Sequence, residues 1–181
     1  MRLLNIIFLL FFTLNYSQMR KSIDAYRFIQ PPKIDGKLDE SEWKMITPSE
    51  GFTFIRPETK AGEKLPEDYE SKVYFGYDNN AIYVGAQLNN PNPNNIPSEF
   101  GPRDIGIFSK SEAFWISLDT YDDRSNYFSF FVTSAGTVAD LFQSGDKGDV
   151  NYDTVFDAKI DINENGWSLE MFIPYLSLIH I

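Results

Sequence analysis

The chain has 181 residues, of which 43% are hydrophobic, 23% charged and 16% aromatic, a composition typical of a folded globular domain and not of a disordered or fibrous protein. Its formal net charge is −10, and such a surface repels the phosphate backbone of nucleic acids. It has no cysteine and a single histidine, which excludes disulfides, thiolate nucleophiles, histidine-based triads and cysteine- or multi-histidine metal sites. The available chemistry belongs to carboxylates, amides and aromatic rings.

Residues 1–17 have the layout of a secretory signal peptide. Arg2 supplies a positive start, residues 6–12 form an unbroken apolar run, and a short polar stretch ends at Ser17. The apolar run is too short to cross a bilayer of about 30 Å as a stable helix. We therefore expect cleavage after Ser17 and a domain of residues 18–181, without a transmembrane helix, that is periplasmic, outer-membrane-associated or secreted. A buried first strand or a retained membrane anchor is the alternative.

The first elements after this segment are short. One or two helical turns carrying Trp43 are predicted, with Asp39 as the N-cap and Glu42 completing a capping box. Residues 51–56 alternate between apolar and polar well enough to predict a strand. The polar residues 59–68, which include glycine and proline, predict a loop.

Period-2 alternation dominates the rest of the chain. The clearest hairpin pairs residues 73–77 with residues 82–88 across a turn at 78–80. No long stretch of period 3.6 follows the signal segment, so short strands at hairpin spacing predict an all-β fold, an antiparallel β-sandwich of immunoglobulin or jelly-roll type. Further strands are predicted at residues 114–118, 127–133, 156–162 and 167–173.

The three tryptophans fall on different predicted faces. Trp43 and Trp167 lie in core phase and are expected to anchor the interior. Trp115 lies on the opposite face of its strand from its two apolar neighbours. An exposed aromatic ring can stack on the C–H face of a sugar while nearby polar groups hold its hydroxyls. The alternative is that Trp115 packs inside the second sheet or under a loop. The sugar-binding candidates are Trp115, Tyr121, Tyr152 and Arg103.

Carboxylates are concentrated in turns. Asp119, Asp122 and Asp123 share one turn, and Ca²⁺ takes 6–8 oxygen ligands from such loops, so they are candidate calcium ligands. The alternative is that they stabilise the turn through its own backbone. A glycosidase needs two carboxylates about 5–10 Å apart across a cleft. In a chain with 26 acidic residues, neighbouring carboxylates are expected as solvated charge, so no catalytic residue is predicted.

Four sequence blocks within residues 28–176 match one known pattern in the same order. They are IDGKLDESEW at 34–43, VYFGYDNNAIYV at 73–84, EAFWISLD at 112–119 and GWSLEMFIP at 166–174. Together they resemble carbohydrate-binding module family 9, in the version found at the N-terminus of long bacterial envelope proteins of unassigned function.

The resemblance implies an exported, non-catalytic β-sandwich that binds polysaccharide or oligosaccharide and tethers a larger polysaccharide-degrading protein. It also implies a structural Ca²⁺ and further strands and a partner domain beyond residue 181, so that the sandwich is incomplete here. Sugar-binding members carry glutamate and arginine at the positions of Trp115 and Phe131. The alternative is therefore a structural or interaction domain of an envelope protein that has lost the sugar site.

Overall fold

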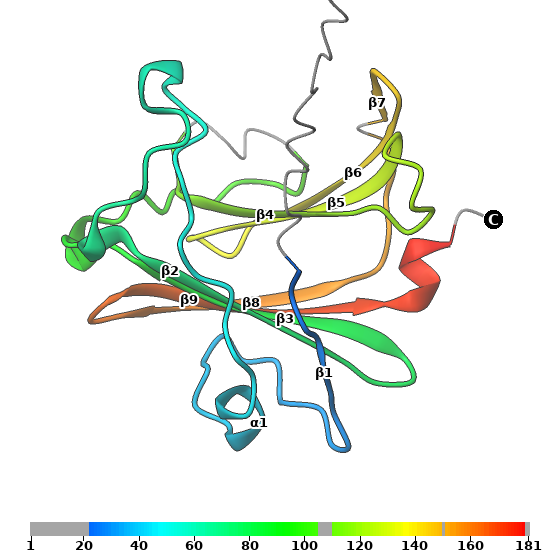
Figure 1. Cartoon of the computed structure of the whole chain (residues 1–181), viewed down its shortest axis with the longest axis horizontal. Helices are drawn as coiled ribbons and strands as arrows, with labels where there is room; N and C mark the ends of the chain where they lie inside the picture. Colours follow the sequence, from blue (N-terminus) through cyan, green and yellow to red (C-terminus); the bar gives the residue numbers. More distant parts are fainter. Residues whose placement is uncertain (1–21, 105–109, 150, 180–181) are drawn as a thin grey trace, which may run out of the picture.

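Two β-sheets stacked face to face form the protein (Figure 1). The computed structural model describes residues 22–104, 110–149 and 151–179, and the predicted signal peptide at 1–17 lies outside them. One sheet has five strands in the order β1-β2-β3-β9-β8, and the other has four in the order β4-β5-β6-β7. All neighbouring strands pair antiparallel except β1 and β2. The predicted β-sandwich is confirmed.

The strands are short and the helical segments shorter. The five-stranded sheet contains β1 (Tyr26–Arg27), β2 (Ser71–Tyr77), β3 (Ala81–Asn89), β9 (Gly166–Pro174) and β8 (Asp157–Asn163). The four-stranded sheet contains β4 (Ala113–Leu118), β5 (Asn126–Thr133), β6 (Val138–Ser144) and β7 (Lys147–Asp149). The helical segments are α1 (Ser41–Lys44) and the 3-10 turns η1 (Glu58–Lys60), η2 (Glu67–Tyr69), η3 (Pro93–Asn95) and η4 (Tyr175–Leu178). Within the described ranges, no helix is long and apolar enough to cross a membrane.

The predicted hairpin is confirmed as β2 and β3. Asp78 closes its turn, because one carboxylate oxygen accepts the backbone N–H groups of Asn80 and Ala81 at 2.7 and 2.9 Å. The later predicted strands are confirmed as β4, β5, β8 and β9. Strands β1, β6 and β7 are additional to the sequence prediction.

The predicted capping box before Trp43 is wrong. Helix α1 begins at Ser41, its N-cap is Glu40, and no side chain caps it. The Ser41 hydroxyl donates to Glu42 Oε2 at 3.0 Å, so Glu42 is not bonded back to Asp39. This single helical turn is held by burial of Trp43 and by backbone bonds at its C-terminal end, and not by side-chain capping.

The predicted strand at residues 51–56 is also wrong. Only one isolated bridge forms, between Thr53 and Lys64, and the segment folds back on itself through Phe54 N–H donating to the Glu63 carbonyl at 2.9 Å. Ile55 is 83% exposed. Alternation alone does not produce a strand here, because the backbone bonds of this segment go to residues 62–65 of the same loop and, within the described residues, to neither of the two sheets.

The main core lies between the two sheets. On β9, Trp167, Leu169 and Met171 are fully buried, and they pack with Phe128 and Phe130 of β5. Alternate residues of each strand face this layer, as the period-2 pattern requires. Trp167 is therefore confirmed as a core anchor.

A second apolar cluster covers the outer face of the five-stranded sheet. Phe28, Trp43 and Ile46 pack on Ala81 and Tyr83, and α1 lies on this side in Figure 1. The segment that brings them there is the stretch between β1 and β2. Trp43 is thus buried as predicted, but outside the space between the sheets.

Two glycines on the outer face of that sheet make the close approach possible. A Cβ at Gly76 would lie 2.1 Å from the Phe28 ring, and a Cβ at Gly85 would lie 2.8 Å from Leu38 and 3.2 Å from the Trp43 ring. A Cβ at Gly76 would force the Phe28 ring to shift, and one at Gly85 would require Leu38 and Trp43 to move by smaller amounts, so larger residues here would disturb the covering segment.

Candidate functional site

The outer face of the four-stranded sheet carries the exposed tryptophan. Exposure alternates along β4, with Phe114, Ile116 and Leu118 turned toward the core and Trp115 and Ser117 turned outward. Trp115 is 56% exposed, so it does not pack inside a sheet or under a loop. The strand phase read from the sequence is confirmed.

Strand pairing gives Trp115 a firm backing. Its partner on β5 is Phe131, and the two ring centroids lie 4.9 Å apart with the planes tilted by 34°. Phe131 is almost fully buried and pairs in turn with Ala139 on β6. The indole therefore rests on an apolar layer while more than half of its surface stays in solvent. This is the arrangement that stacking on a ligand ring requires.

A pair of serines fixes the polar edge of the indole. Trp115 Nε1–H donates to Ser117 Oγ at 2.8 Å, and Ser117 Oγ lies 2.8 Å from Ser129 Oγ on β5. Ser129 is fully buried. Sequence reasoning missed both serines, although their place at two residues from Trp115 and on the paired strand follows from the strand pattern.

The strand residues on this face are uncharged. The register places one row along Trp115, Phe131 and Ala139 and the next along Ser117, Ser129 and Leu141. A third row pairs Tyr127 with Gln143. In a protein of net charge −10, a neutral aromatic and hydroxyl-bearing surface suits an uncharged ligand.

Tyr121 and Tyr152 lie elsewhere, around Phe128. Their rings lie 6.4 and 5.6 Å from the ring of Phe128, which faces the core. The Tyr152 hydroxyl donates to the Ser177 carbonyl at 3.0 Å, and burial raises the pKa of Tyr152. These two rings form one group, but not with Trp115.

Arg103 also lies apart from Trp115, tied to the core-facing side of β6. Its Nη2 donates to Asp140, to the Thr154 carbonyl at 3.0 Å and to Asp153 at 3.1 Å. Asp140 is buried, and burial raises the pKa of its carboxyl while the Thr154 N–H and Arg103 act in the opposite direction. The guanidinium thus holds its own segment against β6 and the chain before β8.

The acidic turn after β4 uses its carboxylates on its own backbone. Asp119 accepts N–H groups from Tyr121, Asp123 and Arg124 at 2.8–3.3 Å. The Asn126 amide and backbone N–H groups bond Asp123 and lower the pKa of its carboxyl. Across the part of the chain that the structure describes, no three acidic or histidine side chains are grouped to hold a metal ion, Asp122 included. Calcium binding by this turn stays a prediction.

Two carboxylates, Glu170 fully buried and Glu112 half-buried, hold the other tryptophans. Glu170 accepts Trp43 Nε1–H at 2.7 Å and the backbone N–H groups of Asp35 and Gly36 at 2.7 and 2.8 Å. Glu112 accepts Trp167 Nε1–H at 2.9 Å. Burial raises the pKa of Glu170, and its N–H donors oppose that shift. Both carboxylates are part of the framework, because each holds a buried indole in place.

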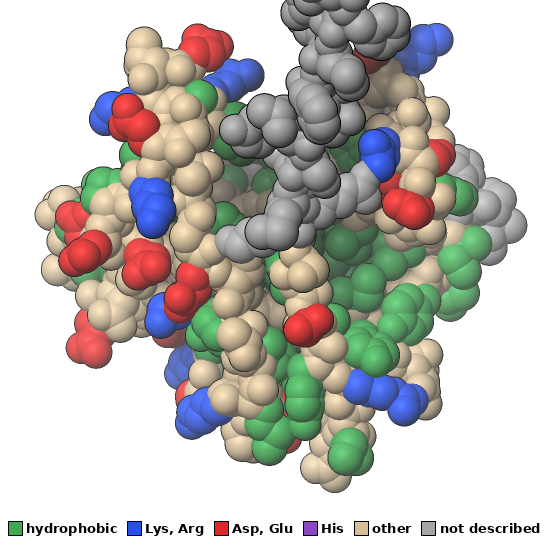
Figure 2. All heavy atoms as spheres, viewed as in Figure 1, with side chains coloured by type: hydrophobic (Ala, Val, Ile, Leu, Met, Phe, Trp, Pro, Cys, Tyr) green, Lys and Arg blue, Asp and Glu red, His purple; other side chains and the backbone are tan. Residues whose placement is uncertain are grey.

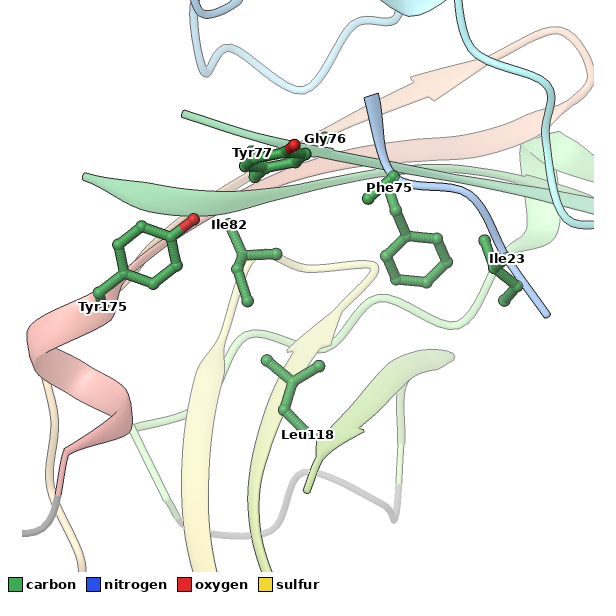
Figure 3. A pocket seen from close by; sticks show the side chains of 8 residues that line it. Ile23, Phe75, Gly76, Tyr77, Ile82, Leu118 and Tyr175 are labelled. Atoms are coloured by element: carbon green, nitrogen blue, oxygen red, sulfur yellow. The ribbon is translucent and has the colours of Figure 1, made fainter. Parts of the chain in front are cut away.

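An apolar cavity of about 350 Å³ lies between the sheets, on the side of β1 and β4 (Figure 3). Phe75 and Ile82 point into it from one sheet and Leu118 from the other, with Ile23 and Tyr175 at its sides. The Tyr175 hydroxyl is already donated to the Asp78 carbonyl at 3.1 Å. Hydrophobic side chains gather near this opening, whereas charged ones gather over residues 51–69 (Figure 2). The cavity offers little to bind sugar hydroxyls.

Comparison with known proteins identifies similar structures only. No protein-family model matches the chain, and no curated protein is significantly similar to it in sequence. A carbohydrate binding module family 9 from Caldicellulosiruptor kristjanssonii in complex with cellotriose superposes with a TM-score of 0.58 at 18% identity, over 84% of this chain and 67% of that one. The complex with glucose gives 0.58 and 18%, over 86% and 69%.

A third structure agrees with these two. A protein from Bacteroides uniformis, provisionally named as carbohydrate-binding, superposes with a TM-score of 0.58 at 9% identity, over 87% of this chain and 75% of that one. At such identities the likeness establishes the fold alone. The chain therefore has the β-sandwich fold of the family 9 carbohydrate-binding modules, as its sequence blocks predict.

Proposed function

We propose that this protein is a non-catalytic carbohydrate-binding module that holds a neutral glycan on the outer face of β4, β5 and β6. The observation that carries the proposal is Trp115, which is 56% exposed and backed by Phe131 on a face without charged strand residues. A flat, immobilised indole stacks on the C–H face of a pyranose, and neighbouring hydroxyls bond its oxygens. The structural neighbours from C. kristjanssonii, which hold cellotriose and glucose, support a neutral glucan as the ligand class.

Two finer statements belong to the same proposal. The charge and apolar pattern of residues 1–17 supports export to the periplasm, the outer membrane or the medium. The family resemblance supports a role in tethering a larger glycan-degrading protein to its polysaccharide. In that arrangement any hydrolysis belongs to the tethered partner, and this domain raises the local concentration of substrate.

The test is a titration of the purified protein with cellotriose and glucose by isothermal calorimetry. Trp115→Ala should weaken binding at least about fivefold, because losing a stacked ring removes about 1–3 kcal/mol. Tyr121→Ala is the matched control, since Tyr121 is an equally exposed aromatic residue at 50% but lies off the Trp115 face. Equal affinities for the wild type and Trp115→Ala would overturn the proposal.

A second candidate function is a structural domain that packs against another protein. The apolar cavity between the sheets favours it, because apolar surface of this kind is normally covered. The same titration separates the two: a folded wild-type protein that binds no neutral glycan favours the structural domain.

A further inference from the structure

We propose that Ser117 is the hydrogen-bond donor of the glycan site and that the buried Ser129 positions it. The inference rests on the proposed function, because it names the polar group that works beside the Trp115 ring. It depends on a chain of two hydrogen bonds. Ser117 Oγ lies 2.8 Å from Trp115 Nε1 and 2.8 Å from Ser129 Oγ.

The direction of the serine–serine bond follows from burial. Ser129 is fully buried, and a buried hydroxyl that does not donate its proton costs about 1–3 kcal/mol. In the described part of the chain, Ser117 Oγ is the polar atom within hydrogen-bond reach of the Ser129 hydroxyl. Ser129 is therefore the donor and Ser117 the acceptor of that bond.

The remaining proton of Ser117 is thereby left for a ligand. Its oxygen accepts from Ser129 and from the Trp115 indole, which together use its two acceptor positions. The Ser117 hydroxyl proton has no protein acceptor among the described residues, and the side chain faces solvent beside the indole. Ser117 thus presents a single donor of fixed position at the edge of the stacking surface.

This geometry selects for oxygen at the rim of the stacked ring. Stacking by itself accepts any flat apolar face, including that of a plain aromatic compound. A donor held beside the indole adds a bond only when the ligand carries an acceptor there, as a pyranose does with its hydroxyl and ring oxygens. Ser117 and Ser129 set both the orientation of the Trp115 indole and the direction of the Ser117 O–H bond. A substitution at either serine should therefore change both.

The hydrogen-bond chain from Trp115 through Ser117 to Ser129 is tested first without ligand. The indole N–H signals in a ¹H–¹⁵N correlation spectrum report on it. The protein has three tryptophans, and Trp43 and Trp167 donate to Glu170 and Glu112, so their signals serve as internal references. Ser117→Ala should shift the Trp115 signal and speed its exchange with water, and Ser129→Ala should do so to a smaller extent. A Trp115 signal that does not respond to Ser117→Ala would overturn the proposed hydrogen-bond chain.

Ligand binding is tested next with cellotriose. Ser117→Ala should weaken binding about five- to tenfold, the worth of one hydrogen bond, and Ser129→Ala about threefold, while Ser117→Thr restores binding. Ser125→Ala, at an exposed serine in the turn before β5, should leave affinity unchanged.

The outcomes separate this inference from the proposed function. Wild-type binding that is lost in Trp115→Ala but unchanged in Ser117→Ala overturns the donor role and leaves the glycan site standing. A wild-type protein that binds neither cellotriose nor glucose overturns both, whatever the indole signals show.

Discussion

The two outer faces of the sandwich differ in whether the chain itself covers their aromatic residues. On the five-stranded sheet, the segment between β1 and β2 lays Phe28, Trp43 and Ile46 over the strands and builds a second core. On the four-stranded sheet, Trp115 stays exposed on a layer formed by Phe131 and Ala139. The second face thus keeps Phe131 and Ala139 buried and leaves Trp115 in solvent, where we propose that a glycan binds.

The hydrogen-bond acceptors of the indole N–H groups also differ between buried and exposed tryptophans. The buried indoles donate to carboxylates, Trp43 to Glu170 and Trp167 to Glu112, whereas Trp115 donates to a serine hydroxyl. A carboxylate gives the stronger bond and locks a framework. A serine adds no charge to the exposed face and, in our proposal, has a proton left for a ligand. The comparison therefore predicts that damage to the covered face costs stability and damage to the open face costs binding.

The largest effect should come from the core tryptophan. Trp167→Ala should lower the free energy of unfolding by about 3–5 kcal/mol, because it empties a fully buried site. Trp115→Ala should lower it by about 1 kcal/mol or less, because most of that ring is already in water. Urea denaturation followed by circular dichroism measures both. Equal losses for the two variants would erase the distinction between the faces.

Removing the carboxylate under the covered face comes next. Glu170→Ala leaves Trp43 Nε1–H and two backbone N–H groups without an acceptor, so a loss of roughly 3 kcal/mol is expected. Glu99→Ala is the control, since the Glu99 side chain is exposed and pairs with Lys110 at the surface, and it should change stability by less than about 1 kcal/mol. The same denaturation experiment applies, and a Glu170→Ala loss as small as that of the control would contradict the assignment.

A matched pair of glycine substitutions sharpens the comparison further. Gly76→Ala drives a methyl group into the Phe28 ring and should cost about 1–3 kcal/mol. Gly148→Ala, on the outer face of the other sheet, meets the flexible end of Gln143 at 3.1 Å and Leu141 at 3.2 Å, so it should cost less than about 1 kcal/mol. Melting temperatures of the two variants test this, and the reverse order would show that the open face is the more tightly packed.

The smallest expected effects are the changes in stability with pH that follow from the shifted pKa values of Glu170 and Asp123. Burial raises the pKa of Glu170 above its ordinary value of 4.5, so the stability that its neutral form contributes is present below pH 4.5 and is lost as pH rises through the folded value. The Asn126 bonds lower the pKa of Asp123 below 3.8, so its contribution is present above that pH and is lost as pH falls through the folded value. Carboxyl ¹³C shifts followed by NMR should show Glu170 titrating at the higher pH, and Asn126→Ala should raise the pKa of Asp123.

Much of the sandwich could be predicted from local patterns. The β2–β3 hairpin and the strands β4, β5, β8 and β9 follow from alternation, and the outward phase of Trp115 follows from its place between Phe114 and Ile116. The strand expected at residues 51–56 does not form, although its residues alternate as those of the confirmed strands do. Among the described residues it pairs only with its own loop, at Thr53 and Lys64, and not with an edge of either sheet, and nothing in the segment itself reveals that outcome.

The candidate site was predictable only in its aromatic centre. Tyr121 and Tyr152 gather around Phe128, and Arg103 bonds Asp140, so three of the four sugar-binding candidates lie away from Trp115. Ser117 and Ser129 became visible through pairing, because the register of β4 on β5 sets them side by side. Residue type marks what a side chain can do, but strand register decides which side chains meet.

The sequence by itself determined strands β2, β3, β4, β5, β8 and β9 and the two faces of each, since side-chain direction in a strand has period 2 and needs no distant contact. Only the tertiary structure decided which outer face is covered, which carboxylate each buried indole reaches, and which residues stand beside Trp115. Glu170 lies 127 residues from Trp43, and Ser129 lies 12 from Ser117. The physical reason is that such contacts depend on sheet order and on the close approach allowed at Gly76 and Gly85, which are properties of the packed molecule.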